Sequence, residues 1–199
     1  MKTISLENYL PENAISYITK WLEGHRCMIK IRKPRQSKLG DYKLLPNQSH
    51  QISINENLKP ELFFFVLTHE IAHLLAFNEK RDILPHGKEW KATFRELLLE
   101  SIQIYPEDLQ ILLKNFTQNP KANFMTSPEL VKYFEHKTSE NQFYVEELSI
   151  NGKFIYQSQI YQVEEKKKKR YLCKNLHTGK RYLFKSCARV EKIESNEFK

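Results

Sequence analysis

Residues 69–73 carry two histidines and a glutamate at a spacing that suits metal chemistry. His69 and His73 are four residues apart, and Glu70 directly follows the first of them. On a helix, residues i and i+4 lie on one face, so two imidazoles can bind one ion while the carboxylate lies beside it. Such a carboxylate can take a proton from water at the ion. The spacing therefore indicates a zinc hydrolase.

The segment around this pentapeptide predicts a buried helix. Residues 62–77 are apolar apart from Thr68 and the pentapeptide itself, and Pro60 suits a first helical turn. Burying three ionisable groups is costly unless something binds them, which favours a metal over the alternative of two hydrogen-bonded core histidines. The segment is too short to span a bilayer and has ionisable side chains at its middle, so we expect no membrane partner.

His86 is the candidate for a third ligand. A catalytic zinc takes three protein ligands and keeps one position open for water. Trp90 and Phe94 begin an apolar series at helical spacing, which predicts a second helix with His86 at the start of its buried face. The loop at 78–85 lets the chain turn back, so packing of the two helices would bring His86 to the pentapeptide. The alternative is a polar residue that opens a helix near a Pro-Gly turn.

His-Glu-x-x-His followed by His-Gly-x-x-Trp resembles the motifs of the SprT-like metallopeptidases. Residues 38–42 and 50–55 resemble the strand pair that leads to the active-site helix in that family, particularly in its compact bacterial branch. The resemblance covers roughly residues 5–115. It implies an α+β, zincin-like metalloprotease domain with helices packed on a small antiparallel sheet. Paired cysteines that build a zinc ribbon in some members are absent here, so we expect no second, structural metal.

The resemblance also implies a site and an activity. By it, His69, His73 and His86 are ligands of one Zn²⁺ ion, and Glu70 is the catalytic glutamate. The expected activity is hydrolysis of protein or peptide substrates, including DNA-associated proteins, with Glu70 activating a zinc-bound water. The alternative is a non-proteolytic nucleic-acid-binding protein with a structural or vestigial metal site. A three-histidine site with an open position is poorly suited to a structural zinc.

The remaining patterns predict two domains. In the first, residues 1–140, His50 shares the inward parity of Ile52 and Ile54, and we interpret it as a hydrogen-bonding histidine and not as a fourth ligand. We place a small antiparallel β module at residues 141–199, with Asn151-Gly152 as a hairpin turn. Helices are predicted at 6–22, 106–116 and 129–136, and strands at 28–33, 50–54, 154–157, 171–174, 181–185 and 188–190.

Positive charge is concentrated in the second domain. Residues 151–199 hold 13 Lys plus Arg against 5 Asp plus Glu, which equals the whole net charge of +8 and leaves 19 of each sign elsewhere. Such a patch attracts phosphates through counterion release, so single-stranded or junction DNA is a predicted partner. The aromatics of this domain stack on bases, or they form its core beside a solvated lysine loop at 166–170; the sequence leaves both open. They are Tyr156, Tyr161, Tyr171, Tyr182 and Phe184.

Composition excludes several other classes. A chain of 199 residues with 40% hydrophobic content can build one ordinary core and a small appendage, so it is not disordered. Cys27, Cys173 and Cys187 are too few and odd in number for a disulfide framework and suit a reducing compartment. Residues 1–10 lack the pattern of a signal peptide, and we expect a cytoplasmic protein. A metal on Cys173, His177 and Cys187 lacks a fourth ligand and a standard spacing.

Overall fold

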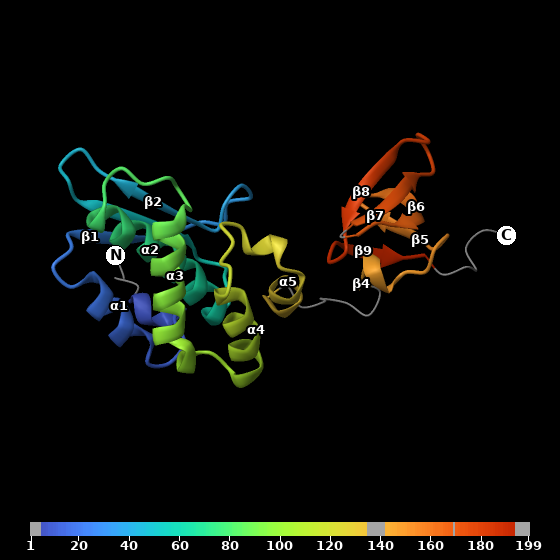
Figure 1. The fold of residues 1–199 in the computed structure, drawn as a ribbon. Helices are drawn as coiled ribbons and strands as arrows, with labels where there is room; N and C mark the ends of the chain where they lie inside the picture. Colours follow the sequence, from blue (N-terminus) through green and yellow to red (C-terminus); the bar gives the residue numbers. More distant parts are fainter. Residues whose placement is uncertain (1–4, 135–141, 169, 194–199) are drawn as a thin grey trace. The chain divides into compact units, whose positions relative to one another are not determined.

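The computed structural model describes residues 5–134, 142–168 and 170–193, and the chain divides into two compact units at Ser127/Pro128 (Figure 1). The predicted boundary after residue 140 lies outside the described residues. Helix α5 (Pro128–Phe134), which the sequence analysis assigned to the first domain, falls in the second unit. Each unit has its own sheet, which gives a mixed α+β protein.

The sheet of the first unit has three strands in the order β1-β3-β2. They are β1 (Cys27–Arg32), β2 (Gly40–Leu44) and β3 (His50–Asn55). β2 and β3 form an antiparallel hairpin, but β1 and β3 are parallel. The expectation of an antiparallel sheet was therefore wrong for one of the two pairings. After β1 the chain first forms the far edge strand β2 and then returns between the two, so β3 runs in the direction of β1.

Four α-helices complete the first unit. They are α1 (Ala14–Leu22), α2 (Pro60–Glu79), α3 (Lys88–Glu100) and α4 (Glu107–Thr117), with 3₁₀ turns η1 (Leu6–Tyr9), η2 (Ile102–Ile104) and η3 (Phe124–Thr126). The single helix predicted at 6–22 is split between η1 and α1. Pro11 disfavours helical backbone at the residue before it, and Asn13 adopts a left-handed conformation with φ of 64°.

Helix α2 is the core of the first unit. It begins with Pro60 in its first turn, as predicted, and packs against β2 and β3 as well as against α3. Its apolar residues are buried on almost every side, and Phe63 and Phe64 have no exposed surface. By length and composition α2 could cross a membrane, but 67% of its most apolar window is buried, as in a core helix. A helix buried in this way holds its polar side chains in fixed positions.

The second unit contains a six-stranded antiparallel sheet. The strands are β4 (Gln142–Tyr144), β5 (Lys153–Tyr156), β6 (Gln159–Lys166), β7 (Arg170–Asn175), β8 (Arg181–Lys185) and β9 (Arg189–Lys192), in the order β4-β9-β5-β6-β7-β8, with η4 (Val145–Glu147). β4 and β6 were not predicted. The β5–β6 turn is made by Gln157 and Ser158, both at positive φ, whereas Asn151-Gly152 precedes β5. Two-residue hairpin turns are recognised in a sequence by glycine or asparagine, and Gln157-Ser158 contains neither, so this turn was not predicted.

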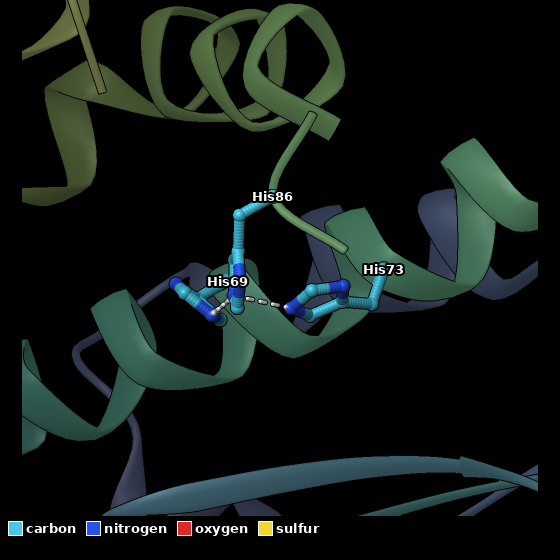
Figure 2. Close-up of side chains that lie close together, drawn as sticks. All are labelled: His69, His73 and His86. Atoms are coloured by element: carbon cyan, nitrogen blue, oxygen red, sulfur yellow. Dashed lines mark hydrogen bonds between the residues drawn. The ribbon is translucent and has the colours of Figure 1, made fainter. Parts of the chain in front are cut away.

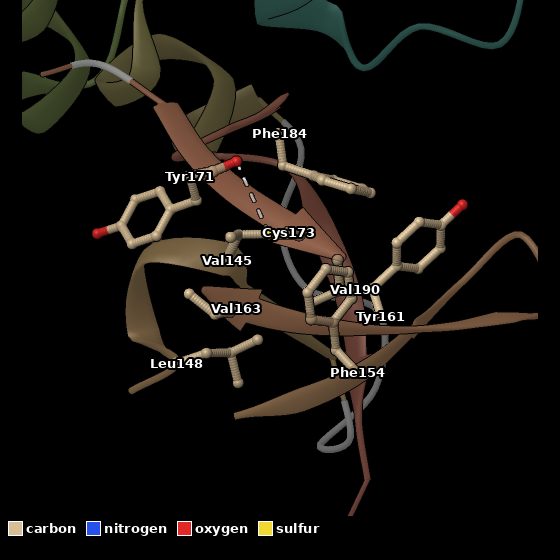
Figure 3. Close-up of a cluster of buried hydrophobic side chains, with 9 residues drawn as sticks. All are labelled: Val145, Leu148, Phe154, Tyr161, Val163, Tyr171, Cys173, Phe184 and Val190. Carbon is tan, nitrogen blue, oxygen red and sulfur yellow. Dashed lines mark hydrogen bonds between the residues drawn. The ribbon is translucent and has the colours of Figure 1, made fainter. Parts of the chain in front are cut away.

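The aromatic residues of this sheet are mainly core. Tyr161, Tyr171 and Phe184 are buried in one apolar cluster, and Tyr156 is partly buried against it. Tyr182 is 44% exposed. The structure thus favours the core interpretation over base stacking for four of the five. Figure 3 shows the buried cluster: Val145, Leu148, Phe154, Tyr161, Val163, Tyr171, Cys173, Phe184 and Val190.

Candidate metal centre

Three histidine rings converge beside α2. His69 and His73 lie on successive turns of that helix, and His86 reaches them from the segment that precedes α3 (Figure 2). The Nε2 atom of His86 is 2.9 Å from Nε2 of His73 and 3.2 Å from Nε2 of His69. The structure therefore brings the three predicted ligand residues to one point.

The backbone at His86 is left-handed, with φ of 59°. This conformation is uncommon for a residue other than glycine and costs of order 1 kcal/mol or more. The backbone N–H of Gly87 donates to the carbonyl of Leu84, which closes a turn just before α3. The sharp change of direction points the His86 ring back toward α2. Strained backbone of this kind is often found where a side chain has a functional position.

Trp90 packs against all three histidines. Its ring centroid lies 4.6 Å from that of His69, 5.3 Å from His73 and 4.6 Å from His86. The indole N–H donates to the backbone carbonyl of His69 at 3.3 Å, and the side chain is fully buried. The helical spacing predicts Trp90 only as part of a buried helix face. Its contact with the site depends on how α3 crosses α2, which periodicity does not report.

Burial keeps the histidines neutral. It lowers the pKa of His69 to about 2 and the pKa of His73 to about 4, and nearby histidines lower both further. Burial also lowers the pKa of His86. A neutral imidazole has one ring nitrogen with a free lone pair, which is the form that binds a metal. All three residues are therefore in the protonation state of a ligand at neutral pH.

Glu70 lies between α2 and β2 and is only 7% exposed. Burial, followed by the nearby charge of Asp41, raises the pKa of its carboxyl to about 8, although Arg35 and a backbone hydrogen bond from Tyr42 oppose that rise. Gly40 of β2 passes so close that a Cβ atom there would lie 2.7 Å from Oε1 of Glu70. Only glycine leaves room for the carboxylate at this point of the strand.

Tyr42 and His50 form a second layer next to the histidines. The Tyr42 hydroxyl is 3.0 Å from Nδ1 of His50, and its ring is nearly parallel to that of His73, at 6.1 Å between centroids. His50 is 6% exposed. The prediction that His50 is a buried hydrogen-bonding residue is confirmed. Tyr42 was missed, because one tyrosine in an alternating strand carries no signal of its neighbours.

The donor set fits a zinc ion. In tetrahedral coordination with Zn–N bonds of 2.0–2.1 Å, ligand nitrogens are about 3.3 Å apart. The ligand atoms of His69, His73 and His86 lie within 4.8 Å of one another, and two of the three separations are close to that value. Within the described ranges, His69, His73 and His86 are the group of histidine, cysteine or carboxylate residues close enough together to hold a metal, and Cys173, His177 and Cys187 are not part of it.

Comparison with known proteins identifies relatives of the first unit. Residues 12–106 match the model of the SprT-like family. The chain is 48% identical over 33 residues to Protein SprT of Glaesserella parasuis serovar 5 (strain SH0165). That match covers 17% of this chain and 21% of the relative, so the chain spans about a fifth of that protein's length. No solved structure matches the chain. The matched family segment contains every residue of the site described above.

Proposed function

This chain belongs to the SprT-like family through residues 12–106, and from that premise we propose that it is a zinc-dependent metallopeptidase acting on protein substrates. The observation that carries the proposal is the convergence of three imidazoles, two of them from the helix that also carries the buried carboxyl group of Glu70. His69, His73 and His86 would hold one zinc ion. When bound, zinc lowers the pKa of water and polarises the scissile carbonyl.

Glu70 is the proposed proton carrier. It directly follows His69, and its carboxyl is held between the backbone of β2 and α2. In this position it accepts a proton from the attacking water and returns it to the leaving amine. A group whose pKa lies near neutral can do both, and burial moves Glu70 in that direction. Trp90 is fully buried and packs against all three rings, so it keeps water from that side of them.

Metal content and cleavage of an unfolded protein test the proposal. The purified full chain should bind about one zinc per chain and cleave denatured casein, and a chelator should stop cleavage. Glu70→Gln should keep the zinc and cleave at least 100-fold more slowly, since general base catalysis contributes about 10²–10⁴. His86→Ala should lose the zinc. His177→Ala is the matched control, because His177 is exposed in the second unit and outside the cluster.

Two results would contradict this proposal. If the parent protein holds no zinc after purification and reconstitution, the proposed metal site is rejected. If Glu70→Gln cleaves as fast as the parent, Glu70 is not the general base, even if the metal is present. An inactive protein that binds zinc and nucleic acid would favour the second candidate, a non-proteolytic nucleic-acid-binding protein.

The outward face of β7 and β8 supports DNA as a partner. Its side chains alternate with the core residues Cys173 and Phe184. Like charges directly opposite each other on neighbouring strands are destabilising. This face has two rows of facing basic residues with a leucine pair between them, and closely spaced basic residues attract phosphates. The cross-strand pairs are Arg170 with Lys185, Leu172 with Leu183, and Lys174 with Arg181, which also binds Glu164.

The salt dependence of DNA binding tests this face. We expect a labelled single-stranded oligonucleotide to bind with an affinity that falls as salt increases. Changing Arg170 and Lys185 together to Gln should reduce the slope of log K against log salt by about 1.4, because each lost phosphate contact contributes about 0.7. The control is Lys114→Gln with Lys121→Gln, two exposed lysines of the first unit. Equal slopes for the parent and the β7–β8 variant would exclude this face.

A further inference from the structure

Tyr42 contacts both chemical groups of the candidate site. Its backbone N–H holds the carboxyl of Glu70, and its ring lies almost parallel to that of His73, with 6° between the two planes. Tyr42 belongs to β2, one of the two edge strands of the first sheet, and pairs with Ile52 of β3. One residue of a strand thus touches the proposed base and one proposed ligand, which both come from α2.

The hydroxyl of Tyr42 is itself held in place. It bonds Nδ1 of His50, which is buried in β3. The ring of His50 lies edge-on to His25, and the side-chain amide of Asn78 is 3.0 Å from Nδ1 of His25. Asn78 at the exposed end of α2 thus supports His25, His25 supports His50, and His50 supports Tyr42. The Tyr42 ring therefore has little freedom to move away from His73.

The His73 side chain is packed by aromatic rings from two elements other than its own helix. Its side chain rests on Trp90 of α3, at 5.3 Å between centroids, and on Tyr42 of β2. His69 is packed instead by Trp90 and Phe94, both from α3. Among these four ring–ring contacts, the one between His73 and Tyr42 connects the histidine cluster to the sheet. An imidazole held in one orientation loses less entropy when it binds a metal.

We propose that Tyr42 is a positioning residue: its ring fixes the orientation of His73 for metal binding, its backbone fixes Glu70, and His50 fixes Tyr42. The proposal rests on the proposed function, because it assigns His73 as a metal ligand. Removing the ring should weaken metal binding without removing any ligand. Replacement of groups that orient ligating histidines typically weakens metal affinity by about 10–100-fold, and we expect a loss in that range.

Zinc affinity measured by competition with a chelating dye tests the proposal in the full chain. Tyr42→Leu should bind zinc about 10–100-fold more weakly than the parent. Tyr42→Phe keeps the ring and should stay within about threefold of the parent, a smaller loss that reflects only the bond to His50. Tyr9→Leu is the matched control. The Tyr9 ring also packs on α2, 5.4 Å from the ring of Phe63, and is half-buried like Tyr42.

A purely structural role predicts a different pattern. Both leucine variants would then lower the melting temperature of the metal-free protein and leave zinc affinity unchanged. Equal zinc affinity in the parent and Tyr42→Leu would overturn the inference, while the metallopeptidase proposal would stand. Equal losses in Tyr42→Phe and Tyr42→Leu would also overturn it, because the ring would not be the source. If Tyr42→Leu does not fold, Tyr42→Met tests the same point. A parent that binds no zinc would instead reject the proposed function.

The absorption spectrum of Co²⁺ gives a second measurement. Cobalt in a tetrahedral site of three nitrogens absorbs visible light, and the bands respond to ligand geometry. At saturating Co²⁺, Tyr42→Leu should show bands that differ in shape from those of the parent, whereas Tyr9→Leu and Tyr42→Phe should reproduce the parent spectrum. Identical spectra for all four proteins would show that Tyr42 does not control the orientation of His73.

Discussion

The buried carboxyl group of Glu70 should make the stability of the metal-free protein fall as pH rises above neutral. Its pKa is about 8 in the folded protein, against an ordinary value of 4.5. The folded state therefore retains a proton that the unfolded state gives up. This raised pKa stabilises the fold fully below pH 4.5, and the contribution is lost as pH rises through 8. Glu70→Gln carries no such proton and should not show this loss.

The window from pH 7 to pH 8 isolates this effect. Burial lowers the pKa values of the three site histidines, so they are neutral in the folded protein across this range, and they are mostly neutral when unfolded. A carboxyl with a pKa of about 8 loses about 1 kcal/mol of its contribution between these two pH values. The same histidines are present in Glu70→Gln, so the stability of the parent minus that of Glu70→Gln should fall by that amount between the two pH values.

Urea unfolding with a chelator present, at pH 7 and pH 8, measures the difference. Glu79→Gln at the exposed end of the same helix is the control and should follow the parent. The reasoning is refuted if the parent and Glu70→Gln change equally between the two pH values. That result would mean that the carboxyl is already ionised at pH 7 in the folded protein. Its burial would then be insufficient to raise the pKa toward the value required of an acid and base near neutral pH.

Three further changes probe other parts of the structure. Gly40→Ala places a Cβ atom 2.6 Å from Cγ1 of Val66 and close to Glu70. The variant should be less stable by about 1–3 kcal/mol and should cleave more slowly while it retains zinc. Cleavage at the parent's rate would contradict the close approach of β2 to Glu70. Co²⁺ should quench the fluorescence of Trp90 in Trp21→Phe, which leaves Trp90 as the single tryptophan, and an unquenched signal at saturation would place the ion elsewhere. Phe154→Ala should destabilise the second unit by about 3–5 kcal/mol in thermal unfolding, and a change below 1 kcal/mol would contradict its place in the core.

Local spacing was sufficient to predict the helices that carry the histidines. The i, i+4 pair lies on α2 and the Trp90 face on α3 because both patterns follow from 3.6 residues per turn. His50 was interpreted correctly from the alternation of one strand. The convergence of His86 with the pair also followed from the two helix faces, although its left-handed backbone could not be foreseen for a histidine before glycine.

The pairing of strands and the packing of aromatic residues were harder to predict from the sequence. The parallel pairing of β1 with β3 depends on which strand occupies the middle of the sheet, and alternation is the same for either order. β6 was missed because its glutamines, glutamates and single lysine leave few apolar residues at alternate positions, and its turn has no glycine. The packing of Tyr161 and Phe184 was left open, since an aromatic residue at a strand position suits either a core or an exposed face.

The amino-acid sequence alone determined which residue types could bind a metal, which helices carry them, and where positive charge accumulates. These properties depend on composition and on periodicity over a few turns. Only the tertiary structure decided that Gly40 lies against Glu70, that Trp90 supports three rings, and that Tyr42 joins the base to a ligand. These contacts join elements that are far apart along the chain, and their geometry is set by how strands and helices pack, which a one-dimensional pattern does not encode.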